Sequence, residues 1–399
     1  MWANDLEFGI RGRERKLKRA PGHLSKWGKA KMTQDDFLSI TREKFNRAVK
    51  EAKPLFCYFS VTEACNLNCK YCGSDSKKPL DNELTTEEVY DVLDNIVEAG
   101  TMAVLLAGGE PTLRKDLLQI AKYGAAHRLR MALNTHGHFI DKEYAWKLRD
   151  AGVLEVKVSI DGLEETHDDN RGKGSFKRVI EALKNCKSVG IPFVEMAATI
   201  SRVNYYELKD LVNLAMELEV GIIANEFSPI GRPTGLFDLI LTREQRREMQ
   251  CYLLKTRKAV GWRKVNFEDI YVVSGDEETK EICADQCRSW GYHDFNLGCI
   301  SGIYVYSITA EGKVIGGDII FPGDVARYPG LVIGDLRKER LSDIWRNSEV
   351  LDLFRNRDNL KGKCGSCKYK YICGGCRRRA YLTGDVMGED PSCWVGDTG

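Results

Sequence analysis

The sequence lacks a long apolar run, an excess of charge of one sign and a secretory signal. Its longest apolar runs are about as short as residues 103–107, far below the roughly 20 residues that span a bilayer. The 60 Lys and Arg nearly balance the 58 Asp and Glu, so the net charge of +2 creates no overall field that attracts nucleic acid or a membrane. Residues 1–32 are basic, but no apolar block follows them as in a signal peptide. We therefore expect a cytoplasmic protein that binds neither nucleic acid nor a membrane.

Cysteine, in contrast, is plentiful, with 14 residues. In a reducing cytosol and a chain of this length, clustered cysteines indicate metal or redox sites rather than disulfides. Three cysteines stand alone, and we expect them to be small buried residues without a function: Cys57, Cys186 and Cys251. The other eleven form three groups along the chain: Cys65, Cys69 and Cys72; Cys283, Cys287 and Cys299; and Cys364, Cys367, Cys373, Cys376 and Cys393.

Residues 55–260 alternate short apolar, β-branched runs with longer amphipathic stretches. This alternation predicts βαβ units around a parallel sheet. Because parallel sheets bind ligands at the carboxyl ends of their strands, we expect the chemistry just after each strand. The expected strands are 56–61, 102–106, 130–134, 154–160, 193–200 and 221–227, and the expected helices are 86–98, 116–127, 142–150, 175–189, 205–218 and 242–260.

From residue 261 onward the alternation gives way to loops rich in cysteine and glycine. Within them we expect a hairpin at residues 304–315 that turns at Glu311 and Gly312. We therefore divide the chain into a basic N-terminal extension (1–54), an α/β region (55–260) and a metal-binding region (261–399). The extension is expected to pack on the edge of the core or to form a mobile arm.

The first cysteine group directly follows the first expected strand. Cys65, Cys69 and Cys72 are separated by three and then two residues, and no fourth cysteine accompanies them. A structural zinc site closes all four positions, whereas an iron-sulphur cluster held by three thiolates leaves one iron open for another ligand. The spacing therefore indicates an active site with an open iron, with an incomplete zinc knuckle as the alternative.

With Tyr71 before its third cysteine, this segment resembles the CxxxCxxC motif of the radical S-adenosylmethionine (SAM) superfamily. After the second expected strand, Gly108, Gly109 and Glu110 match the GGE motif of that family, in which the strand end and the carboxylate hold the amino group of SAM. The resemblance implies an α/β fold with a partial (β/α)6 barrel. It also implies SAM and a 4Fe-4S cluster as cofactors, with Cys65, Cys69 and Cys72 as the catalytic cluster ligands.

Polar residues after the next strands match further SAM contacts of this family. By resemblance, Asn134 at the end of the third strand and Ser159 and Asp161 at the end of the fourth would contact the ribose and methionine parts of SAM. Arg171 resembles the arginine that pairs with the SAM carboxylate, with a surface arginine as the alternative.

The last cysteine group resembles a SPASM extension, a module that holds auxiliary 4Fe-4S clusters. Its paired cysteines alone would also suit a zinc ribbon. The match implies that Cys364, Cys367, Cys373 and Cys393 bind the distal auxiliary cluster and that Cys376 returns to a nearer one. The step from Cys373 to Cys376 is one residue shorter than is usual in this pattern.

The ligand set of the nearer cluster departs from the SPASM pattern. This cluster would take Cys299 together with Cys283, Cys287 or both. However, Gly317, followed by Asp318, stands where SPASM sequences carry a further cysteine. We expect Cys283 and Cys287 together to complete the set, with an oxygen of Asp318 or an open iron as the alternatives.

The tail from residue 334 onward is similar to the radical SAM enzymes of alternative haem and haem d1 synthesis, which trim acetate or propionate side chains from iron tetrapyrroles. The similarity lies in residues 343–348, 357–358, 360–362, 373–381, 384–385 and 389–391. It implies reductive cleavage of SAM to a 5′-deoxyadenosyl radical that abstracts hydrogen from the substrate, with a reduced ferredoxin as electron donor. We expect side-chain removal or decarboxylation on an iron tetrapyrrole.

The sequence leaves other substrates and functions open. Maturases of tungstopterin enzymes and of ribosomal peptides share much of this tail, although residues 1–54 look short for the leader-binding region of a peptide maturase. An iron-sulphur electron carrier or a zinc-binding module is disfavoured, because it needs no amino-acid-binding barrel. Arg377, Arg378 and Arg379 could contact substrate carboxylates, face solvent or tune a cluster. His136 and His138 could bind a haem iron, donate a proton or simply be hydrogen-bonded.

Overall fold

The structure, a computed structural model, describes residues 46, 49–261, 263–267, 299–317, 325, 329–371 and 373–393. The expected ligands Cys283, Cys287 and Asp318 lie outside the described residues, as does most of the N-terminal extension. Within the described residues, ten strands form one sheet in the order β10-β9-β8-β1-β2-β3-β4-β5-β6-β7. The sheet thus includes strands from both the α/β region and the cysteine-rich region.

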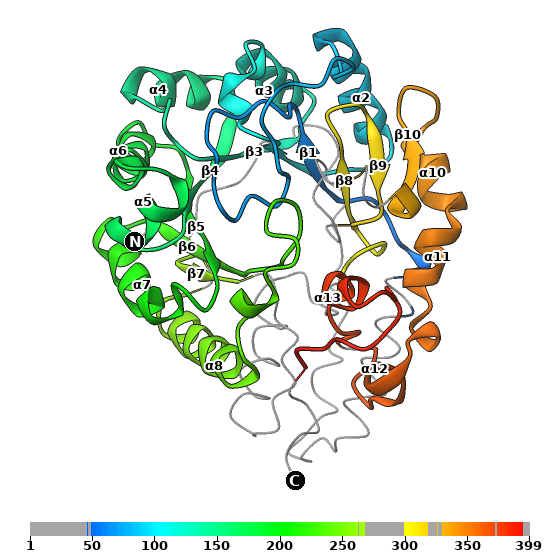
Figure 1. Cartoon of the computed structure of the whole chain (residues 1–399). Helices are drawn as coiled ribbons and strands as arrows, with labels where there is room; N and C mark the ends of the chain where they lie inside the picture. The colour runs from blue at the N-terminus through cyan, green and yellow to red at the C-terminus, as the bar shows by residue number, and fades with distance from the viewer. Residues whose placement is uncertain are drawn as a thin grey trace, which may run out of the picture.

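Six parallel strands form the centre of this sheet, each where the sequence predicts one. Along β1, β2 and β5, buried side chains alternate with partly exposed ones, because successive side chains of a strand point to opposite faces of the sheet. The buried face packs against the helices. Figure 1 shows the helices arranged around the outside of the curved sheet. The α/β fold and the partial barrel are therefore confirmed. The strands are β1 (Phe56–Ser60), β2 (Ala103–Ala107), β3 (Arg130–Thr135), β4 (Val153–Ile160), β5 (Phe193–Ile200) and β6 (Gly221–Glu226).

The helices between these strands form because each has an apolar face and a defined start. In α2, Val89, Leu93 and Ile96 are buried against the sheet, and Thr85 begins the helix with a capping box. One helix, α5 (Glu164–Arg171), lies where no element is predicted from the sequence. None of the described helices is long and apolar enough to cross a bilayer. The others are α2 (Thr86–Glu98), α3 (Leu117–Ala126), α4 (Lys142–Asp150), α6 (Ser175–Ser188), α7 (Leu208–Glu217) and α8 (Arg243–Val260).

The cysteine-rich region extends the sheet beyond β1. Strand β8 (Val305–Ile308) pairs in parallel with β1, and its antiparallel partner β9 (Lys313–Ile315) pairs in turn with β10 (Val332–Asp335). The β8–β9 hairpin confirms the prediction for residues 304–315, and Gly312 supplies the positive φ of +88° at its turn. On the opposite edge, the short strand β7 (Val265–Asn266) pairs with β6.

Short helices complete the C-terminal part of the chain. They are α10 (Leu341–Asn347), α11 (Glu349–Arg355), α12 (Gly362–Ser366) and α13 (Arg377–Leu382). Of the three cysteines that stand alone in the sequence, Cys57 and Cys186 are buried in the core as predicted, whereas Cys251 on α8 is only half-buried.

Candidate active site and auxiliary cluster site

Residues at or after the carboxyl ends of strands β1 to β4 line a single cavity in the barrel, which we call the barrel cavity. Most of the predicted cluster and SAM contacts meet there, although they come from distant parts of the sequence. They are Cys65, Cys69, Cys72, Gly108, Gly109, Glu110, Asn134, Ser159 and Arg171. Asp161 is not among the residues that line this cavity. The carboxyl ends of the parallel strands therefore bring together what the motifs predict.

The loop that carries the three cysteines, residues 65–72, is held in place by Arg232 from the segment after β6. The Arg232 guanidinium donates to the carbonyl oxygen of Cys69, and its backbone N–H donates to the carbonyl oxygen of Cys72 at 2.9 Å. Gly231 packs so closely here that a Cβ would lie 2.1 Å from the carbonyl oxygen of Gly73. No motif marks this turn, so neither residue is predicted from the sequence.

The thiols of the loop lie in a partly desolvated setting. Burial raises the pKa of Cys65 to about 11. Burial also raises the pKa of Cys69, while the Arg171 guanidinium opposes that rise. Since iron binds the thiolate, loading a cluster here releases protons and compensates the buried negative charge. Three thiols that line one cavity would fit a cluster that keeps one iron open for another ligand.

The two glycines of the GGE segment let it lie against the start of the cysteine loop. Gly109 N donates to Thr62 O at 2.8 Å, and Glu110 N donates to Ala64 O at 2.7 Å. A Cβ at Gly108 would lie 2.2 Å from Thr62 O, and one at Gly109 would lie 2.3 Å from Ala64 O. Only glycine therefore allows this close approach, which places Glu110 beside the cysteine loop.

The Glu110 carboxylate lines the barrel cavity and is held by three neighbours. Its Oε1 accepts hydrogen bonds from Thr112 and, at 2.7 Å, from the Thr135 hydroxyl, while Oε2 accepts one from His136 N at 2.8 Å. Burial raises the pKa of Glu110, and these hydrogen bonds oppose the rise. Because Oε2 receives fewer donors than Oε1, it retains the capacity to accept a hydrogen bond from a ligand ammonium.

His136 connects the GGE segment to the cysteine loop. Its Nδ1 accepts a hydrogen bond from His138 N at 3.1 Å, so Nε2 carries the proton and donates to Asn66 Oδ1 at 2.8 Å. Burial lowers the pKa of His136 to about 3 and that of His138 to about 4, and His138 Nε2 lies 2.7 Å from Ser175 Oγ. Both rings are neutral and hydrogen-bonded, which favours the structural interpretation over a haem-iron ligand.

Asp161 acts on the barrel cavity through Arg171. Its Oδ2 accepts hydrogen bonds from Arg171 Nε at 2.6 Å and from Asn170 Nδ2 at 2.5 Å. Burial lowers the pKa of Arg171, but the ion pair with Asp161 and the nearby cysteine sulphurs outweigh it and raise the pKa overall, so the guanidinium stays charged. Among the described residues, none bonds the two terminal nitrogens of Arg171, which remain available for a ligand carboxylate.

Four cysteines of the C-terminal group surround a second cavity, which we call the auxiliary cavity. They are the four predicted to bind the distal cluster: Cys364, Cys367, Cys373 and Cys393. Across the part of the chain that the structure describes, no three His, Cys, Asp or Glu side chains converge closely enough to hold a single metal ion. Four thiols around one cavity supply the number of protein ligands that a 4Fe-4S cluster takes.

Backbone N–H groups point at the sulphurs of this auxiliary cavity. Tyr369 N donates to Cys367 Sγ, Gly375 N to Cys373 Sγ and Asp390 N to Cys364 Sγ, each at 3.4 Å. Gly375 adopts a φ of +63°, and a Cβ there would lie 2.7 Å from Cys364 Sγ. Donors of this kind stabilise cluster-bound thiolates, so the residues present fit the predicted group.

The remaining predicted ligands lie outside this ring of four cysteines. Cys376 does not line the auxiliary cavity, and its N–H donates to Asp390 Oδ2 at 3.0 Å. Cys299 N donates to Cys373 O at 3.0 Å. At Gly317, where SPASM sequences carry a cysteine, a Cβ would lie 2.6 Å from the Ser301 Cβ. Packing against Ser301 therefore accounts for the glycine, and the ligands of the nearer cluster stay a prediction.

Comparisons with known proteins agree with this geometry. A sequence model of the radical SAM superfamily matches residues 59–215, and one of the SPASM iron-sulfur cluster-binding domain matches residues 299–368. An AdoMet-dependent heme synthase of Methanosarcina barkeri is 33% identical over 347 residues, which cover 85% of this chain and 96% of that protein. The chain belongs to the radical SAM superfamily. This radical SAM protein is also 27% identical to the mycofactocin maturase MftC of Mycolicibacterium smegmatis, over 89% of this chain and 86% of MftC.

Solved structures show the same fold. The crystal structure of Streptococcus suis SuiB bound to S-adenosylmethionine has a TM-score of 0.67 and 17% identity, covering 91% of this chain and 84% of SuiB. Native anSMEcpe with bound AdoMet has a TM-score of 0.61 and 16% identity, covering 83% of this chain and 92% of that chain. The protein is therefore a radical SAM enzyme with a SPASM extension, and its cofactors are SAM and 4Fe-4S clusters.

Proposed function

We propose that this radical SAM enzyme acts on an iron tetrapyrrole and removes or decarboxylates one of its carboxylate side chains. The relative named as a heme synthase supports this choice, since the match covers 96% of its length. The observation that carries the proposal is the position of Arg378, which lines the barrel cavity together with the predicted SAM contacts.

The three consecutive arginines of α13 have different surroundings. Arg377 is 1% exposed and donates from Nη1 to the carbonyl oxygens of Val386 and Gly388, each at 2.8 Å. Arg379 is buried against carboxylates of the protein itself. Arg378 alone of the three lines the barrel cavity. A guanidinium there suits a substrate with carboxylate groups, because it can bind a carboxylate through two parallel hydrogen bonds.

The chain's own residues would prepare SAM for the reaction. Cys65, Cys69 and Cys72 would hold the open cluster, which would supply the electron for cleaving SAM to methionine and a 5′-deoxyadenosyl radical able to abstract hydrogen from the substrate. Glu110 Oε2 would accept the SAM ammonium, and the terminal nitrogens of Arg171 would pair with its carboxylate. Asp161 would orient Arg171, while Asn134 and Ser159 would contact the remaining parts of SAM. The surrounding cavity would keep water away from the radical.

A peptide substrate is the second candidate. The similarity to the mycofactocin maturase MftC over 89% of this chain favours it. Maturation of a tungstopterin enzyme is a further alternative. A ferredoxin-type electron donor and a cytoplasmic location are part of the same proposal.

The test is anaerobic incubation with SAM, dithionite or a reduced ferredoxin, and iron tetrapyrrole carboxylates whose side chains carry deuterium. We expect deuterium in 5′-deoxyadenosine and a matching loss of mass from the tetrapyrrole. Arg378→Gln should raise the KM for the tetrapyrrole about tenfold or more, as expected for a lost charged contact. Arg247→Gln, an exposed arginine on α8, is the matched control. Formation of 5′-deoxyadenosine with a peptide, and none with any tetrapyrrole, would favour the maturase candidate.

A further inference from the structure

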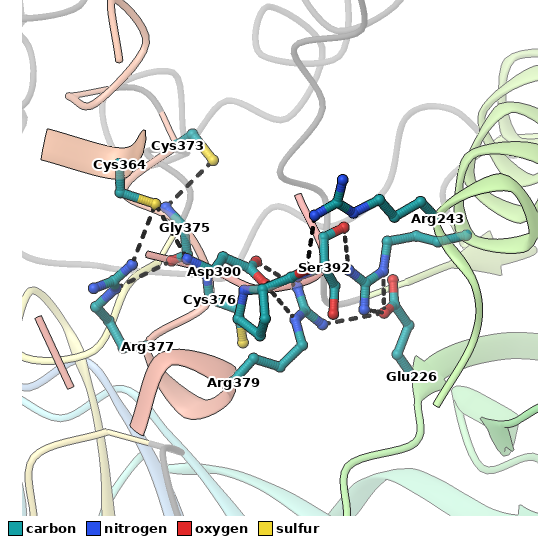
Figure 2. A network of polar contacts seen from close by, with 12 residues as sticks. Glu226, Arg243, Cys364, Cys373, Gly375, Cys376, Arg377, Arg379, Asp390 and Ser392 are labelled. Carbon is teal, nitrogen blue, oxygen red and sulfur yellow. Dashed lines mark hydrogen bonds and ion pairs between the residues drawn. The ribbon is translucent and has the colours of Figure 1, made fainter. Parts of the chain in front are cut away.

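Five buried polar side chains connect the end of β6 to the wall of the auxiliary cavity. Glu226 ends β6, Arg246 and Gln250 lie on α8, Arg379 lies on α13, and Asp390 follows that helix. Each of the five is at most 5% exposed. Figure 2 shows the Arg379 guanidinium between the carboxylates of Asp390 and Glu226. We call these five residues the interdomain network.

Arg379 is shared between two carboxylates. Its Nε and Nη2 donate to Asp390 Oδ1 and Oδ2, both at 3.0 Å, and its Nη1 donates to Glu226 Oε2 at 3.1 Å. Arg246 donates to the same Glu226 oxygen at 2.6 Å and to the carbonyl oxygen of Ser392 at 2.7 Å. The two carboxylates and two guanidiniums balance each other, so the network as a whole adds no net charge.

The interdomain network forms a wall between the two cavities. Glu226 lines the barrel cavity, whereas Arg246, Arg379 and Asp390 line the auxiliary cavity. Asp390 lies directly behind the cysteines, since its backbone N–H donates to Cys364 Sγ. A change in the charge on Asp390 or Arg379 therefore acts on a cluster in the auxiliary cavity over a short distance in a weakly polarisable interior.

We propose that Arg379 sets the reduction potential of the auxiliary cluster by compensating the charge of the Asp390 carboxylate beside it. This inference rests on the assignment of that cluster to the four cysteines of the auxiliary cavity. Arg379 is a positioning residue, because it acts on the cluster through Asp390. A reduced cluster carries one more electron than an oxidised one, so an uncompensated Asp390 carboxylate would disfavour reduction.

The test is a redox titration of the anaerobically reconstituted holoenzyme, followed by electron paramagnetic resonance. The signal to follow is the one that SAM addition leaves unchanged and that changing Cys364, Cys367, Cys373 and Cys393 together to alanine removes. At the wild-type midpoint, Arg379→Gln should lower the ratio of reduced to oxidised auxiliary cluster at least tenfold, which equals 59 mV for one electron. Asp390→Asn should raise the ratio, and the double variant should return close to the wild-type value. Arg247→Gln, an exposed arginine on α8, should leave the midpoint unchanged.

The midpoint shifts expected of Arg379→Gln and Asp390→Asn have opposite signs, which distinguishes an electrostatic effect from general disruption of the site. A midpoint that Arg379→Gln leaves unchanged would overturn the proposal, as would shifts of the same sign in the two single variants. If Arg379→Gln fails to load the auxiliary cluster, Asp390→Asn decides alone, because an unchanged or lowered midpoint there contradicts the proposal. Iron analysis of a variant with all four cysteines changed to alanine tests the cluster assignment separately. Undiminished iron would reject the assignment, whatever the arginine variants show.

Discussion

Replacing Glu110 by glutamine probes SAM binding in the barrel cavity. The change preserves the size of the side chain but turns one carboxylate oxygen into an amide donor. Oε1 accepts hydrogen bonds from Thr112 and Thr135, whereas Oε2 accepts one from His136 N, so the amide nitrogen will occupy the Oε2 position. There it faces another donor and offers no acceptor to the SAM ammonium.

The magnitude follows from the lost contact. A hydrogen bond to a charged group contributes about 1.5–3 kcal/mol, and each 1.36 kcal/mol corresponds to a factor of about ten. We therefore expect the SAM dissociation constant of Glu110→Gln to rise roughly 10- to 100-fold. The thermal midpoint should fall as well, because His136 N loses a buried acceptor. Iron content should stay at the wild-type level, since no cysteine is altered.

Calorimetric titration of the anaerobically reconstituted enzyme with SAM measures this effect. Glu63→Gln is the matched control: Glu63 is also a buried carboxylate, and it accepts hydrogen bonds from Ser60 at 2.8 Å and Ser76 at 2.6 Å. Because Glu63 does not line the barrel cavity, its variant should lose stability without losing SAM affinity. Unchanged SAM affinity in Glu110→Gln would show that the carboxylate only supports the backbone around it. Equal weakening by Glu63→Gln would point to general destabilisation.

Three further predictions concern the clusters and the histidines. Reconstitution should give about eight to twelve irons per chain, and changing Cys65, Cys69 and Cys72 to alanine should remove about four of them and all activity while the protein stays folded. Gly231→Ala should displace the cysteine loop and lower the iron content, whereas Gly235→Ala, which also has a positive φ but has open space around it, should not. Lowering the pH from 7.5 to 5.5 should reduce the free energy of unfolding, since an unfolded histidine binds a proton near pH 6.5 while buried His136 has a pKa of about 3. His136→Gln should recover about 1.4 kcal/mol of that loss, which denaturant titrations at both pH values will measure.

The sequence predicted the strands well because each buried strand is a short β-branched run bounded by turn residues. It also predicted which residues meet in the barrel cavity, since parallel strands bring their carboxyl ends to one side of the sheet. The spacing of the cysteines along the chain also predicted two separate cluster sites. Cys364, Cys367, Cys373 and Cys393 surround one cavity, whereas Cys65, Cys69 and Cys72 line another.

The partners of charged side chains could not be predicted, because they come from residues far apart in the chain. Nothing in the sequence distinguishes Arg232 from an exposed arginine, yet it holds the cysteine loop. The three arginines from Arg377 to Arg379 look identical in the sequence. Consecutive residues of a helix point about 100° apart, so Arg377 faces Cys364, Arg378 faces the barrel cavity and Arg379 faces the interdomain network.

Regions 55–260 and 261–399 differ in sequence pattern, yet each completes the binding surface of the other. Strand β8 covers the edge of β1 and places Ser307 in the wall of the barrel cavity, where Arg378 of α13 joins it. In return, Glu226 of the barrel receives Arg379. Without residues 261–399, β1 would present an unpaired strand edge. Glu226 would also lose Arg379, one of its two buried cationic partners, and a buried carboxylate without enough compensating charge destabilises a protein. The C-terminal region therefore contributes to the structure of the barrel cavity.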